Sequence, residues 1–280
     1  MTYVQFTPSP PLNAYINCVY YCDQSMPYTR EQIMPTPWHN LMINFGGAFK
    51  AYEAGESKPF VTCSDSWWLG LRGAHHIVEW PRDMQLFIVD FKPGGAYPFL
   101  EIPLSELHHQ VVPLDAVWGT FAADMREQLY TAPTNQARFS LLERLLLARL
   151  RPAPDRLSAM QNAVNQIAAS NGALSIRALS DQMGISQKHL IAQFKRLVGG
   201  TPKELARMYR FLHVLYTIDP AQPADWTHIA HQFEYYDQSH FNREFAAFTG
   251  LCPTDYLNQR RRVQAEHPQH ARYVRQLATG

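Results

Sequence analysis

Apolar residues follow two different spacings along the chain. Between residues 38 and 91 they come in short runs, rich in β-branched and aromatic side chains and broken by glycine and proline. In WHNLMINFGG, alternate positions share one face of an extended segment: His39, Leu41, Ile43 and Phe45. DMQLFIVDF predicts a second, largely buried strand, and the turn-rich KPGGAYPF follows it. This pattern of short strands and turns predicts a small β-domain of sandwich or barrel type.

From about residue 113 the apolar positions take helical spacing instead. ARFSLLERLLLARL (137–150) carries one apolar stripe, which consists of Phe139, Leu142, Leu145, Leu146 and Leu150. Either the β-domain or the same helix of a second subunit must cover this stripe, and the sequence leaves both open. The proline-containing RPAPDR (151–156) predicts a linker or a helix stop. Residues 156–262 then have the pattern of an all-helical domain.

The helical half contains an internal repeat. LSDQMGISQKHLIAQFKRLVGGTP (179–202) matches IAHQFEYYDQSHFNREFAAFTGLCP (229–253) at an offset of 50, which becomes 51 after one extra turn residue. The equivalent pairs are Phe194 with Phe245, Gly199 with Gly250, and Pro202 with Pro253. A repeat of this length indicates one supersecondary unit that is used twice.

Each copy predicts a helix, a tight turn and a second helix. In the first copy, Ser175 can cap one helix, Gly184 can end it in the left-handed conformation, and Ser186 can cap the next. In the second copy, Asp237 takes the capping position. Two short helices joined by a tight turn form a helix-turn-helix, whose second helix enters the major groove of DNA.

A long helix is predicted between the two copies. In TPKELARMYRFLHVLYTI (201–218), Thr201 and Glu204 have the spacing of a capping box, and Pro202 falls at the first helical position. This helix is suited to holding the two units rigidly apart.

The second helix of the second copy has an unusually polar outer side. If its phenylalanines face inward, the opposite side presents Gln238, Ser239, Asn242 and Arg243. Amide and guanidinium groups can pair with the edges of adenine and guanine. Because the repeat contains two such units in register, the sequence favours helices that contact DNA over ordinary solvent-exposed helices.

Charge and composition add to this interpretation. Hydrophobic residues make up 46% and charged residues 18% of the chain, as in ordinary globular proteins. Residues 1–154 contain 11 Lys and Arg against 14 Asp and Glu, a net charge of −3, whereas residues 155–280 contain 14 against 10, a net charge of +4. The positive half is the half with the repeat, which is consistent with an anionic partner such as nucleic acid.

The cysteines and the N-terminal residues indicate a cytoplasmic protein. None of the four cysteines forms a C-x-x-C pair, so the sequence predicts neither a zinc site nor a redox motif. The first residues lack the pattern of a signal peptide, and no apolar run has the length of a membrane span.

Two runs in the repeat resemble the AraC/XylS family of bacterial transcription regulators over about residues 175–260. They are S-x-x-x-L-x-x-x-F-K…G-x-T-P (Ser186 to Pro202) and Y-x-D-Q-S-H-F-x-R-x-F…G-x-x-P (Tyr235 to Pro253). The resemblance implies a regulator, either an activator or a repressor, that binds double-stranded DNA and meets RNA polymerase. It assigns DNA-facing positions to Gln187, Lys188, Ile191, Ala192, Gln238, Ser239, Asn242 and Arg243, with Lys195 and Arg196 as phosphate contacts.

Two positions depart from the family pattern. Ala192 stands where the family commonly has arginine, and Ile191 lies beside it, so the first copy would read a thymine methyl group or contribute little specificity. Glu234 stands in the second turn where the family usually has glycine. If the backbone keeps a positive φ there, this residue costs about 1 kcal/mol.

The N-terminal half resembles the sensor domain of a family subgroup, through PTPWHNLMINFGG and FKPGGAYPFL. Such domains are cupin-like, and they bind a small effector, dimerise, or do both. The candidate ligand-binding residues are Trp38, His39, Trp67, Trp68 and Trp80, although aromatic residues suit a packed core equally well. His75 and His76 are neighbours on a strand and point to opposite faces, so they cannot chelate together. We expect no metal and no cofactor.

The sequence therefore predicts an α+β protein. Residues 1–152 form a small β-barrel or cupin-like domain with helices, for effector binding or dimerisation. Residues 156–262 form an all-α domain of two helix-turn-helix units joined by a long helix, and residues 263–280 form a tail. The predicted function is sequence-specific, effector-controlled regulation of transcription, without enzymatic activity. The alternatives are a cupin-type enzyme, a methyl-accepting repair domain, or an effector-free protein-interaction domain fused to the same DNA reader.

Overall fold

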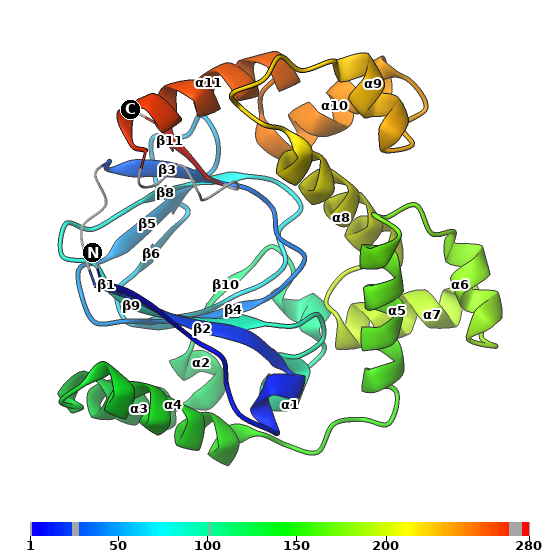
Figure 1. The fold of residues 1–280 in the computed structure, drawn as a ribbon. Coiled ribbons are helices and arrows are strands. Elements are labelled where there is room, and N and C mark those ends of the chain that lie inside the picture. The colour runs from blue at the N-terminus through cyan, green and yellow to red at the C-terminus, as the bar shows by residue number, and fades with distance from the viewer. Residues whose placement is uncertain (1, 24–27, 101, 269–275, 280) are drawn as a thin grey trace.

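The computed structural model describes residues 2–23, 28–100, 102–268 and 276–279 and shows a β-sandwich packed against a helical domain (Figure 1). One sheet of the sandwich has six antiparallel strands. In spatial order they are β1 (Thr2–Phe6), β2 (Ile16–Asp23), β9 (Gln85–Phe91), β4 (Asn40–Asn44), β7 (Ser66–Leu69) and β10 (Val111–Pro113). The predicted strands in WHNLMINFGG and DMQLFIVDF are confirmed as β4 and β9, which lie side by side.

The second sheet faces the first and has five strands. Their order is β11 (Gln276–Thr279), β3 (Arg30–Ile33), β8 (His76–Glu79), β5 (Phe49–Tyr52) and β6 (Val61–Cys63). The edge strand β11 comes from the end of the chain and pairs antiparallel with β3. The C-terminal tail therefore returns to the N-terminal domain, which its sequence did not indicate.

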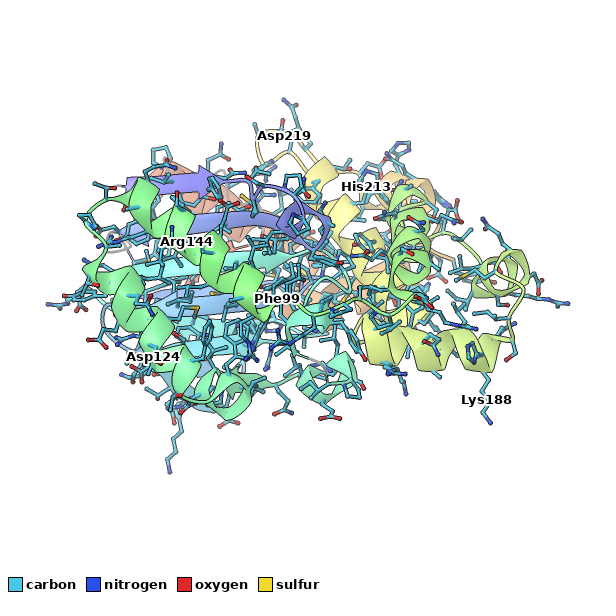
Figure 2. The ribbon with its side chains drawn as sticks, turned by 90° about the horizontal axis from the view of Figure 1, so that it is seen from below. Phe99, Asp124, Arg144, Lys188, His213 and Asp219 are labelled. Atoms are coloured by element: carbon cyan, nitrogen blue, oxygen red, sulfur yellow. The ribbon has the colours of Figure 1, made fainter. Side chains whose placement is uncertain are left out.

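Helices cover the outer face of the six-stranded sheet (Figures 1 and 2). They are α2 (Asp115–Trp118), α3 (Thr120–Thr131) and α4 (Asn135–Arg149), while the shorter η1 (Leu12–Ala14), α1 (Tyr97–Leu100) and η2 (Leu104–Leu107) lie towards the helical domain. The stripe on α4 packs inward, because Phe139 stacks on Phe6 at 5.1 Å and meets Phe87 at 5.2 Å between ring centroids. The β-domain is thus the cover of this stripe, of which Leu142 and Leu146 are also buried.

The helical domain contains the two predicted helix-turn-helix units. After α5 (Leu157–Ala169), the first unit is α6 (Ile176–Gln182) and α7 (Gln187–Leu197), and the second is α9 (Trp226–Gln232) and α10 (Gln238–Thr249). The helix α8 (Pro202–Thr217) joins the two units, and α11 (Pro253–Glu266) leads back over the five-stranded sheet (Figure 1).

The predicted helix ends are confirmed in atomic detail. The hydroxyl groups of Ser175 and Ser186 accept hydrogen bonds from backbone N–H groups of the first turns of α6 and α7. Thr201 and Glu204 form the capping box of α8. Gly184 has a φ of +63°, the left-handed conformation that ends α6.

Candidate nucleic-acid interface and effector cavity

The first unit presents a polar face on α7. Leu190 and Phe194 are fully buried below it, which turns the other side of the helix outward. The exposed members of the predicted set are Gln187, Lys188, Ala192, Lys195 and Arg196, and Ile191 is half-buried. Lys188 extends outward from the rim of the molecule (Figure 2). We name these six residues the α7 face.

One member of the α7 face already has a partner in the other domain. The Arg196 guanidinium donates a hydrogen bond to the Tyr97 hydroxyl at 3.2 Å, and it lies over the same ring. Arg196 was predicted to contact phosphate. In this arrangement it also joins α7 to α1 of the N-terminal domain.

The second unit presents the corresponding face on α10. The Asp237 carboxylate caps the helix by accepting from the backbone N–H of His240 at 2.6 Å. Gln238, Ser239 and Arg243 are exposed, whereas Asn242 is half-buried and its Oδ1 has no hydrogen-bond partner among the described residues. We name Gln238, Ser239, Asn242 and Arg243 the α10 face. The Gln238 amide oxygen accepts from the Thr227 hydroxyl at 2.9 Å, which orients the side chain on the helix.

The turn before α10 contains a residue that the sequence analysis missed. Tyr235 is buried, whereas its neighbour Tyr236, two residues before the start of α10, is 89% exposed. An aromatic ring held open at this place can pack against the sugar-phosphate backbone. The sequence does not indicate this difference, because only the packing of the folded chain decides which of two adjacent tyrosines is buried.

Helix α8 supports both units from between them. Near its start, Leu205 belongs to the core that includes Phe194. Towards its end, Phe211 meets Phe245 at 5.6 Å in the core of the second unit. Arg207 of α8 pairs with Glu244 of α10 at 2.6 Å. The two faces are therefore carried by one rigid helix, as the sequence predicted.

A cavity of about 220 Å³ lies between the two sheets of the N-terminal domain. Of the candidate ligand residues, Trp38, Trp67 and Trp80 line it. Trp68 does not, because its ring packs in the core at 5.0 Å from Phe91. His39 also lies outside the cavity lining.

One wall of the cavity touches both helix-turn-helix units. We name residues 33–39, which run from the last residue of β3 to the start of β4, the wall segment. Ile33, Met34 and Trp38 are among its cavity-lining members. Met34 is also buried in the core of the second unit, with Trp38 packed against that core. His39 lies directly against Gly199 at the end of the first unit.

Two further contacts join the five-stranded sheet to the second unit. Gln32 of β3 donates a side-chain hydrogen bond to the backbone carbonyl of Thr249. His75, just before β8, lies against Gly250. Since Gly199 and Gly250 are equivalent in the repeat, the N-terminal domain contacts the same place in both units, each time with a histidine.

Burial shifts the titration of several groups near the cavity. It lowers the pKa of His39 to about 3, with nearby His108 adding to the effect, and it lowers the pKa of His76 to about 3. Both imidazoles are therefore neutral at pH 7. Burial also raises the pKa of Glu31 to about 8, which keeps this carboxyl group largely protonated. Within the described part of the chain, no three His, Cys, Asp or Glu side chains come together as metal ligands.

Two protein-family models match separate parts of the chain. Residues 179–259 match the family model described as a helix-turn-helix domain, and residues 4–113 match a domain of unknown function (DUF6597). No curated protein sequence matches the chain. Across residues 2–23, 28–100, 102–268 and 276–279, no helix is long and apolar enough to cross a membrane.

Similar solved structures include several of ToxT from Vibrio cholerae. ToxT from strain O395 is 11% identical, with a TM-score of 0.45 over 86% of this chain and 97% of that chain. The complex of that protein with (E)-4-(8-methylnaphthalen-1-yl)but-3-enoic acid is also 11% identical, with a TM-score of 0.45 over 86% and 98% of the two chains. ToxT from strain SCE256 with bound unsaturated fatty acid is 11% identical, with a TM-score of 0.43 over 85% and 94%. Similarity this low carries no argument about function.

The two capped reading helices and the matched domain define a DNA-binding protein of the helix-turn-helix class. More specifically, the C-terminal helix-turn-helix domain is of the AraC type.

Proposed function

We propose that this regulator reads double-stranded DNA with the α7 and α10 faces together, and that a small molecule in the N-terminal cavity controls the reading. The α10 face supplies the amide and guanidinium groups that pair with base edges. The α7 face is poorer in such groups, and its Lys188, Lys195 and Arg196 are suited to phosphates.

The observation that carries the control by a small molecule is the position of the wall segment. Its residues line the cavity, enter the core of the second unit through Met34, and reach Gly199 of the first unit through His39. An occupant that moves this segment must disturb the support of both reading helices. Differential contact of this kind is what an effector needs to shift a conformational equilibrium.

DNA reading is tested by selection from a pool of random duplexes. The purified protein should enrich a defined sequence and bind it at least about 10³-fold more tightly than random DNA at physiological salt. Enrichment of no sequence at all would refute specific reading.

Coupling to the cavity is tested with two methionines. Met34 and Met84 are both buried in the N-terminal domain, but only Met34 also packs in the core of the second unit. Met34→Ala and Met84→Ala should both lose about 2–5 kcal/mol of stability. Only Met34→Ala should also change the affinity for the selected duplex. Equal affinities in the two folded variants would show that the wall segment does not support the readers.

The proposal includes the partners that the family resemblance implies, namely RNA polymerase and a second copy of this chain, and it places the protein with the DNA in the cytoplasm. A second copy would have to use a surface other than the buried stripe of α4, and Tyr130 and Leu147 lie exposed on α3 and α4. Sedimentation at micromolar concentration decides between a monomer and a dimer.

A further inference from the structure

The cavity of the N-terminal domain has two different ends. Ile33 pairs with His76 between β3 and β8, and Asn40 pairs with Asp90 between β4 and β9. Both pairs lie at the same end, because Asn40 also pairs with Leu69 of β7, and Arg72, three residues after Leu69, lies close enough to His76 to lower its pKa. Trp80 stands further along the chain from His76, at a distance of about 13 Å for extended backbone.

The end near Trp80 is mainly aromatic, with Lys50 beside the rings. The Phe49 ring lies 5.4 Å from that of Trp80 and 5.5 Å from that of Trp67, and all three rings line the cavity. Met42 and Ile88 complete this end. An engineered protein cavity of about 150 Å³ can hold benzene, so about 220 Å³ has room for one aromatic ring with a small substituent.

The end near the wall segment contains buried polar groups with unused hydrogen-bonding capacity. Arg72 and His76 line it and are 8% and 6% exposed. Arg72 Nε and His76 Nδ1 have no hydrogen-bond partner among the described residues. Unmet capacity of this kind is costly in a protein interior, so a ligand that supplies the partner gains affinity.

The same end also contains an acceptor. Asp90 lines the cavity, and its carboxylate accepts a hydrogen bond from the Asn40 side-chain amide. The outer nitrogen of Arg72, Nη2, is engaged by Glu53 at 2.9 Å. A head group that fits this end must therefore offer both an acceptor and a donor. Arg72 would attract an anionic head that Asp90 repels, and Asp90 would attract a cationic head that Arg72 repels, so a neutral head that accepts from one group and donates to the other suits both.

We propose that the cavity binds a small neutral aromatic amide, or a compound with the same paired acceptor and donor, as the effector of this regulator. The carbonyl oxygen accepts from Arg72 Nε–H and His76, the amide N–H donates to Asp90, and the ring lies among Phe49, Trp67 and Trp80. This inference rests on the proposed function only in treating the cavity as the effector site.

Calorimetric titration of the full chain with four ring compounds tests the head-group preference. The probes are benzamide, benzoate, benzylamine and toluene. Benzamide should bind at least about tenfold more tightly than each of the others, because an unmade buried hydrogen bond or an opposed charge costs about that factor. The proposal is overturned if toluene binds equally well, if either charged compound binds more tightly, or if none of the four binds.

Variants test the polar residues individually. His76→Leu should weaken benzamide binding about tenfold and leave toluene binding unchanged. His75→Leu is the matched control, because His75 lies against Gly250 outside the cavity lining, and it should leave benzamide binding unchanged. Equal effects of the two variants would contradict the assignment.

Asp90→Asn provides a readout that does not depend on stability. Removing the charge should reduce the preference for benzamide over benzoate within one and the same variant, and an unchanged preference would contradict the role of Asp90. DNA binding separates the two levels of inference. A protein that reads its selected duplex but binds none of the four compounds would overturn the ligand class and leave DNA reading intact.

Discussion

His39 packs so closely against Gly199 that a Cβ atom on the glycine would lie 2.8 Å from the imidazole Cε1. Gly250, the equivalent residue of the second unit, is in the same relationship to His75, at 2.6 Å. Both glycines also have a positive φ, +99° and +71°. The two equivalent glycines of the repeat thus follow the ends of α7 and α10, and each contacts the N-terminal domain.

Gly199→Ala should destabilise the protein by more than the backbone conformation explains. The positive φ alone costs about 1 kcal/mol, and the new methyl group must also displace His39. Gly184→Ala is the control, since Gly184 has a φ of +63° with nothing within 4 Å of the added atom. Thermal unfolding should show a clearly larger loss for Gly199→Ala. Equal losses of stability would mean that His39 moves away from the new methyl group at no cost in free energy.

Acid should destabilise the protein through its buried imidazoles. In the unfolded chain, His39 and His76 take up protons near pH 6.5, whereas in the folded protein burial lowers the pKa of each to about 3. Between these values the unfolded state binds more protons, so stability falls as the pH falls, by up to about 1.4 kcal/mol per pH unit for each histidine. The contribution is absent above pH 6.5.

His39→Leu isolates one of these contributions. The variant should lose stability less steeply than the parent protein between pH 6 and pH 4, as measured by denaturant unfolding at each pH. Parallel pH profiles would show that His39 is protonated without unfolding the interface.

Glu234→Gly should stabilise the second unit. Glu234 has a φ of +57°, so the backbone does keep the left-handed conformation in which the family usually has glycine. Relief of this strain should raise the free energy of unfolding by up to about 1 kcal/mol. Glu234→Ala removes the carboxylate but keeps the strain, and it should leave stability near that of the parent. If alanine stabilises as much as glycine, the charge and not the backbone is responsible.

Arg243→Ala should weaken binding to the selected duplex by about 1–3 kcal/mol and binding to random DNA by less. Arg243 is exposed on the α10 face, where a guanidinium can pair with guanine. Arg144→Ala is the control, because Arg144 is an exposed arginine on α4, at the other side of the molecule from Lys188 of the α7 face (Figure 2). Equal losses on both duplexes would assign Arg243 to phosphate contact alone.

Local signals in the sequence determined the helical domain. Caps such as Ser186 and Asp237, the left-handed Gly184 and the period of the phenylalanines act within a few residues, so a repeat of them predicts the same unit twice. The stripe on α4 was equally visible, but its partner was not, because an apolar face does not specify what covers it. The structure shows that the six-stranded sheet does.

Only the tertiary structure decided what lies between the two domains. Trp38 and His76 line the cavity, whereas their neighbours in the chain, His39 and His75, lie against the glycines of the two units. The sequence predicted opposite faces for His75 and His76 but not what each face meets, since that depends on how the two sheets pack and on where the helical domain docks. The same limit applies to β11, whose pairing with β3 joins residues from the two ends of the chain. Contacts of such long range come from packing of the whole chain, not from any local pattern.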